Sequence, residues 1–276
     1  MTTKPTPPGT ALTLRREYLS GHRRAIIGRA LAGSLAGVLP IPFLDDWALE
    51  AVLGGGYRGI ARAHGLDVDA DAVKILVHGP AGPVRMTDLA ISGIAARLIG
   101  KAAKRMMLAL ATVNRARAAS RTFVTMTLFD HYCARLHTGP ALDAQTALAL
   151  RDAIAKAIDN TPGALSFHPF RRGAIAAARA TLRAPLELAD LASRGALRRM
   201  LTKRSGAAPE VADAEVVSEI DAAVETALAK PDAFLARTVA AVELHLTADA
   251  NPFLDGAIEN LDRRWRAYIS ALKART

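Results

Sequence analysis

Apolar residues recur at every third or fourth position through almost the whole chain of 276 residues, which is the spacing of one face of an α-helix. No convincing run alternates apolar and polar residues between turn residues, and 58 alanines favour closely packed helices. The sequence therefore predicts an all-α protein. The clearest apolar stripe, at intervals of 4, 3, 4, 3 and 4, needs a partner face to bury it and consists of Leu254, Ile258, Leu261, Trp265, Tyr268 and Leu272.

Proline, glycine and aspartate divide the chain into its predicted helices. Pro40 must end the first helix because it lacks a backbone donor, and Pro42 suits the first turn of the next helix, which Gly65 stops. Asp143 is expected to begin a helix in the same way as the aspartates that follow Gly65. The predicted helices cover about 12–38, 43–64, 67–78, 87–114, 118–137, 143–159, 171–204, 209–229, 231–247 and 252–274.

The uncharged stretch over residues 30–44 predicts an apolar helical hairpin broken by Pro40 and Pro42. As a helix it would extend about 22 Å, against roughly 30 Å for the hydrocarbon core of a bilayer, so it is too short to span a membrane. Asp45 and Asp46 follow at once, and carboxylates there would be costly in lipid. We expect this hairpin motif to pack inside the protein, with its two acids complementing the positive end of a helix dipole. Interfacial insertion and an acidic site are the alternatives.

Charge divides the chain into a flexible tail, a basic body and an acidic module. The tail is residues 1–10, rich in Thr and Pro. Formal charge is +9 over residues 1–140, +6 over 141–205 and −5 over 206–276, which gives the net +10 of the whole chain. We therefore predict a multi-helix bundle over 11–205 and a smaller C-terminal three-helix module over 206–276.

The basic residues gather in two helical tracts, which could attract polyanions such as anionic lipid. Nucleic acid is not favoured as a partner, because the tracts contain neither a recognisable reader fold nor interleaved aromatic residues. A solvated face, or pairing with the acidic module, is the plainer alternative for the same residues. The candidate lipid-binding or anion-binding residues are Arg97, Lys101, Lys104, Arg105, Arg171, Arg172, Arg198 and Arg199.

The sharpest candidate for chemistry is the segment from Phe129 to His137. Asp130, Cys133 and His137 share one helix face there, and all three residue types can bind zinc. Three ligands on two turns of one helix rarely converge on one ion, so we expect a packed helix and no metal. An enzyme with a site around His131, Cys133, His137 or His168 is a third hypothesis, for which no orienting group can be named.

The order of a small-residue helix, the segment "PIPFLDDWAL", a second helix and "IARAHGLDVD" resembles the bacterial EcsC family. It is also similar to the helical domain of unknown function of YcjF-like membrane-linked GTPases, although no GxxxxGK[ST] phosphate loop is present. The resemblance covers about residues 25–137 and departs from the pattern at His64, where a tyrosine is usual. It implies an all-helical, membrane-associated protein without known chemistry.

Charge and resemblance together predict a non-enzymatic helical protein that binds the membrane surface through its basic helices. The single cysteine, Cys133, favours a reducing compartment, so we expect a cytoplasmic protein at the inner face of the membrane. No cofactor motif is found and no cofactor is expected. Partners would be an anionic membrane surface and, through residues 206–276, a protein. The main alternative is a soluble helical scaffold or adaptor.

Overall fold

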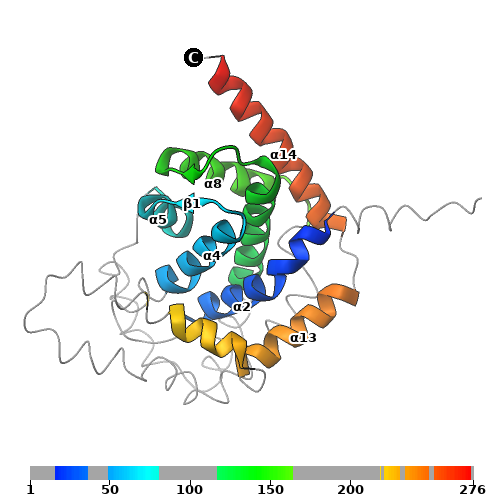
Figure 1. Cartoon of the computed structure of the whole chain (residues 1–276). Coiled ribbons are helices and arrows are strands. Elements are labelled where there is room, and N and C mark those ends of the chain that lie inside the picture. Colours follow the sequence, from blue (N-terminus) through cyan, green and yellow to red (C-terminus); the bar gives the residue numbers. More distant parts are fainter. Residues whose placement is uncertain are drawn as a thin grey trace, which may run out of the picture.

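In the residues that it describes, the computed structural model is all-α apart from two strands of two residues each, which confirms the predicted fold class (Figure 1). The structure describes residues 16–36, 49–80, 117–163, 218, 221–230, 234–248 and 252–274. Within these ranges, no helix is both long enough and apolar enough to cross a membrane. Of the predicted hairpin over 30–44, residues 37–44 lie outside the described residues, as do the predicted helices 87–114 and 171–204.

Three helices end within one residue of the boundary expected from the sequence: α5 (Ala70–His78), α8 (Ala144–Asp159) and α14 (Pro252–Lys273). Two further helices are named by their residues, the central helix (117–131) and the helix over 221–229. The labelled elements are η1 (Glu17–Leu19), α2 (Ser20–Ala36), η2 (Glu50–Gly54), α4 (Gly55–Ala63), β1 (Asp67–Val68), α5 (Ala70–His78), η5 (Tyr132–Leu136), β2 (Ala141–Leu142), α8 (Ala144–Asp159), α13 (Phe234–Ala248) and α14 (Pro252–Lys273).

The central helix lies in the middle of the hydrophobic core (Figure 1). It carries large apolar side chains on several faces instead of one stripe, and Phe123, Met126 and Phe129 are each at most 2% exposed. A helix with this pattern is stable only where other helices surround it. It ends in the π-helical turn η5, so its last residues lie where several elements meet.

Local capping groups begin α8 and end α4 at the residues that the sequence predicted. Asp143 caps α8, because its carboxylate accepts a hydrogen bond of 2.7 Å from the Thr146 amide. At the end of α4, Gly65 has a φ of +69°, and the amides of Gly65 and Leu66 return to the carbonyls of Arg62 and Ala61. This is a Schellman motif, which glycine favours because it has no Cβ.

The two strands were not expected from the sequence, since two residues are too few to show an alternating pattern. They pair in parallel, with Asp67 opposite Ala141 and Val68 opposite Leu142. β1 follows the end of α4, and β2 follows the end of η5. The pairing therefore holds the C-terminal end of α4 beside the C-terminal end of the central helix.

The acidic C-terminal segment shares the hydrophobic core with the basic part of the chain. α13 packs against α2, and α14 packs against α8. The predicted stripe of α14 is buried at its centre, where Ile258, Leu261 and Trp265 are at most 4% exposed. The Trp265 ring stands edge-on to Tyr132 at 4.9 Å between centroids. Leu272, at the far end of the stripe, is 45% exposed, and this end of α14 extends beyond the other described helices (Figure 1).

The three consecutive glycines at 54–56 allow close contacts with α4. A Cβ at Gly55 would lie 2.0 Å from Asp221 Oδ1 and 2.5 Å from an Arg29 nitrogen, and one at Gly56 would meet Met126 at 2.6 Å. These distances are too short for real carbon contacts. The glycines therefore make the room in which a buried arginine and a C-terminal carboxylate lie against the start of α4.

Candidate functional site

The residues predicted to bind lipid and those of the hairpin motif fall outside the part of the chain that the structure describes. They are Arg97, Lys101, Lys104, Arg105, Arg171, Arg172, Arg198, Arg199, Pro40, Pro42, Asp45 and Asp46, and His168 lies outside it as well. The three candidate metal ligands, Asp130, Cys133 and His137, are all described. The structure separates the first of these from the other two.

Cys133 and His137 make contacts of their own. Burial raises the pKa of the Cys133 thiol, which is the opposite of what a nucleophilic or metal-binding cysteine requires. His137 Nε2 donates to the Gly139 carbonyl at 2.9 Å, so its Nδ1 accepts from the Tyr132 hydroxyl at 2.8 Å. Both imidazole nitrogens of His137 are thus engaged at the entry to β2.

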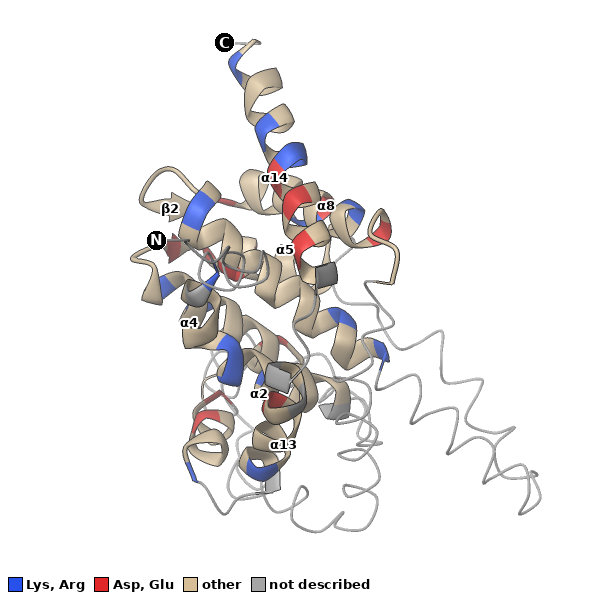
Figure 2. Cartoon of the chain, turned by 90° about the vertical axis from the view of Figure 1, so that its right-hand side faces the viewer, with Lys and Arg blue, Asp and Glu red and all other residues tan. Residues whose placement is uncertain are grey.

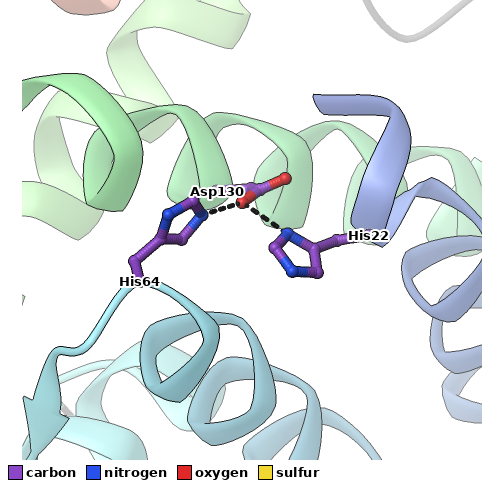
Figure 3. Close-up of side chains that lie close together, drawn as sticks. All are labelled: His22, His64 and Asp130. Carbon is purple, nitrogen blue, oxygen red and sulfur yellow. Dashed lines mark hydrogen bonds and ion pairs between the residues drawn. The ribbon is translucent and has the colours of Figure 1, made fainter. Parts of the chain in front are cut away.

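Asp130 instead lies between two histidines that come from distant parts of the sequence (Figure 3). Its Oδ1 accepts hydrogen bonds from His22 Nδ1 at 3.0 Å and from His64 Nε2 at 2.7 Å. The two rings meet edge to face, with 5.3 Å between their centroids. One ligand atom from each residue lies within 4.8 Å of the others. We call these three residues the His-Asp cluster.

Each member of the cluster is held by the end of a helix. His22 lies in the first turn of α2, His64 is the C-cap residue of α4, and Asp130 is in the last turn of the central helix. The Schellman turn at Gly65 and the pairing of β1 with β2 fix the end of α4 near the central helix. Backbone geometry, and not a flexible loop, therefore sets the positions of the three side chains.

Burial within the His-Asp cluster is uneven. The Asp130 side chain is 0% exposed, whereas those of His22 and His64 are 27% and 19% exposed. Asp130 Oδ2 is buried without a hydrogen-bond partner among the described residues, and Figure 3 shows it turned away from both rings. An ionised carboxylate in such a place needs compensating positive charge. The cluster therefore consists of a fully buried carboxyl group and two imidazoles that solvent partly reaches.

A second polar network is centred on His131, the residue that follows Asp130 in the central helix. The carboxylate of Asp262, in α14, accepts a hydrogen bond of 2.7 Å from His131 Nε2, so His131 Nδ1 accepts from the Tyr18 hydroxyl. The guanidinium of Arg135 lies over the Tyr18 ring, 4.8 Å from its centroid. Adjacent residues on a helix point about 100° apart. Asp130 and His131 can therefore serve two different networks.

The protonation states of this second network follow from burial. Burial lowers the pKa of His131 more than the hydrogen bond to Asp262 raises it. Burial likewise raises the pKa of the Tyr18 hydroxyl, although nearby Arg16 and Arg135 oppose the shift. A neutral histidine between a protonated hydroxyl and a carboxylate has the connectivity of an activated nucleophile. Here the high pKa of the hydroxyl makes it a poor nucleophile, and the network serves to join η1, the central helix and α14.

A shallow depression lies beside the C-terminal end of α4. It has a volume of about 280 Å³ and is lined by Arg58 and Arg62 of α4, Gly65 and Leu66 of the following turn, and Asp67 and Val68 of β1. Two guanidinium groups at its edge give it a basic lining. It is small for a ligand-binding pocket, since such pockets typically enclose about 300–1,000 Å³.

Sequence reasoning singled out Asp130 but not the histidines that join it. His22 shows no local signal, because its partner is 108 positions away. His64 stood out only as the residue at which the chain departs from the EcsC-like pattern. No family model, curated protein or solved structure matches this chain.

Proposed function

We propose that this protein associates peripherally with anionic membrane surfaces through its basic helices, at the inner face of the cytoplasmic membrane. The attraction is electrostatic, with each basic residue near an anionic surface contributing about 1 kcal/mol. The formal net charge of +10 supports the proposal. It is also the function that the EcsC-like resemblance implies for residues 25–137.

The observation that carries the proposal is the internal use of acidic side chains from the C-terminal segment. Asp221 and Glu225 pair with Arg29, and Asp255 pairs with Arg16. Asp262 accepts from His131. These four carboxylates form ion pairs or hydrogen bonds with residues of the N-terminal half. Four carboxylates of the acidic segment are therefore already paired within the described part of the chain.

The C-terminal end of α14, which projects beyond the other described helices, also supports the proposal. Lys and Arg residues follow one another along this end of the helix (Figure 2), at Arg263, Arg264, Arg266 and Lys273. The Arg266 side chain is 77% exposed, and Leu272 beside Lys273 is 45% exposed. Basic residues next to exposed apolar side chains are typical of helices that lie on a charged lipid surface.

Co-sedimentation with vesicles tests the proposal. The full chain is mixed with phosphatidylcholine vesicles, or with vesicles that also contain phosphatidylserine, across a salt series. We expect binding only to the anionic vesicles, weakening as salt rises because salt screens the attraction. The double substitution Lys101→Gln with Lys104→Gln should weaken binding by about 2 kcal/mol, or roughly 30-fold.

The matched control is the double substitution Lys74→Gln with Lys156→Gln. It removes the same charge from exposed side chains on α5 and α8, but each of these lysines already faces a carboxylate, Asp71 at 3.9 Å and Asp152 at 2.8 Å. We expect its binding to be close to that of the wild type. Absence of binding to anionic vesicles at every salt concentration would overturn the proposal and favour the soluble adaptor. Equal losses in both double variants would show attraction by net charge alone.

A further inference from the structure

We propose that His22, His64 and Asp130 form a binding site for a divalent transition-metal ion of the zinc class. This inference is independent of membrane association. Two imidazoles and one carboxylate are a common set of protein ligands for such ions. Here they come from three helices and meet at one carboxylate oxygen, with contacts of 3.0 and 2.7 Å (Figure 3).

The separations of the ligand atoms suit a small ion. Around a tetrahedral zinc ion, ligand atoms that are each about 2.0 Å from the metal lie about 3.3 Å from one another. The two hydrogen-bonded separations are a few tenths of an ångström shorter, and no pair in the His-Asp cluster exceeds 4.8 Å. Small rotations of the exposed imidazoles would therefore admit the ion. The His22 Nδ1 and His64 Nε2 protons would be released to solvent on binding.

The burial of the Asp130 carboxylate is a second reason to propose a metal ion at the His-Asp cluster. Asp130 is 0% exposed, and among the described residues it forms no ion pair with a lysine or arginine. Its Oδ2 has no hydrogen-bond partner there. A carboxylate buried without a positively charged partner is costly, because an ionised group loses its hydration there. A divalent cation supplies the missing positive charge.

Donor type and exposure define the class of ion. Imidazole nitrogen favours zinc and its first-row neighbours over Ca²⁺ and Mg²⁺, which take oxygen ligands. Three protein ligands leave at least one coordination position free, as in zinc sites that bind water or substrate. His22 and His64 are partly exposed, so this position would face solvent.

The test is Zn²⁺ binding to the full chain, purified without a polyhistidine tag and stripped with chelator. Cys133→Ser, which removes the only thiol, serves as the background. We expect one Zn²⁺ per chain by calorimetry and by elemental analysis after dialysis. We also expect Co²⁺ to give the visible absorption of a tetrahedral site of nitrogen and oxygen ligands.

Single substitutions identify the ligands. His64→Gln and His22→Gln should each weaken Zn²⁺ binding by more than about 100-fold, which exceeds the effect of losing an outer-shell partner. His137→Gln is the control, because it removes an imidazole that is also hydrogen-bonded but lies outside the cluster. The proposal is overturned if the wild-type chain binds no stoichiometric Zn²⁺, or if His64→Gln binds it as tightly as His137→Gln does. Should a variant fail to fold, an octahedral Co²⁺ spectrum in the parent protein would likewise reject the site.

Discussion

Arg29 of α2 donates a hydrogen bond of 2.6 Å to the carboxylate of Asp221, although the two residues are 192 positions apart in the sequence. The same guanidinium bonds to Glu225 and, at 2.8 Å, to the carbonyl of Val52. Its side chain is 4% exposed, whereas those of the two acids are 30% and 60% exposed. A buried arginine thus joins the N-terminal helix to the C-terminal segment at the start of α4.

Removing this guanidinium should destabilise the fold. In Arg29→Met the apolar part of the side chain is kept, but the Val52 carbonyl and the Asp221 carboxylate lose their donor. We expect the free energy of unfolding to fall by about 1.5–3 kcal/mol, the range for hydrogen bonds to charged groups. Urea denaturation measures the change. Lys156→Met, which breaks an exposed pair with Asp152, should cost less than about 1 kcal/mol. Similar losses in both variants would contradict the importance of the buried arginine.

Two glycines of α4 should respond in opposite ways to the same substitution. A Cβ at Gly55 would collide with the side chains of Asp221 and Arg29, so Gly55→Ala should destabilise by about 1–3 kcal/mol. Gly59 lies in the same helix, and a Cβ there would have nothing within 4 Å, so Gly59→Ala should stabilise by about 0.5–1 kcal/mol. Thermal denaturation of both variants checks this. A loss of stability in Gly59→Ala would place it in a contact that the structure does not show.

The pH dependence of stability should include a contribution from His131. Burial is the main cause that lowers its pKa in the folded state below the ordinary value of 6.5. The unfolded chain therefore binds more protons in this range, and stability is lost as pH falls below 6.5 towards the folded pKa. Burial lowers the pKa of His137 as well, with the same sign. In urea titrations between pH 7 and pH 5, His131→Gln should lose less stability than the wild type. Parallel profiles would contradict this assignment.

The cap of α8 offers a local test. Asp143→Ala removes the acceptor for the Thr146 amide and should cost about 1 kcal/mol, whereas Asp143→Asn keeps an acceptor and should cost little. Hydrogen bonds from Thr146 hold the pKa of Asp143 below its ordinary value of 3.8. This stabilisation is present above pH 3.8 and is lost as pH falls through the folded pKa. Denaturation at neutral and acid pH compares the variants, and equal costs for Ala and Asn would exclude a capping role.

Part of the candidate site followed from local sequence. Gly65 marked the end of α4, which places His64 at its C-cap, and the segment containing Asp130 was already a candidate for chemistry. The partners of Asp130 did not follow. The candidate ligands considered beside it, Cys133 and His137, do not contact it: His137 bonds to Tyr132 and Gly139, and Cys133 is buried. Ligands that converge usually come from different elements, and nothing in the spacing of one helix indicates which elements those are.

The sequence by itself determined the all-α class, the caps at Asp143 and Gly65, and the buried stripe of α14, because helix period and capping depend on residues at most a few positions apart. Only the tertiary structure decided that His22, His64 and Asp130 meet, that Arg29 binds Asp221, and that Asp67 pairs with Ala141. The side-chain hydrogen bonds among these residues join positions between 66 and 192 apart. They exist because packing of the apolar faces brings the helix ends together, and no short-range pattern encodes that arrangement.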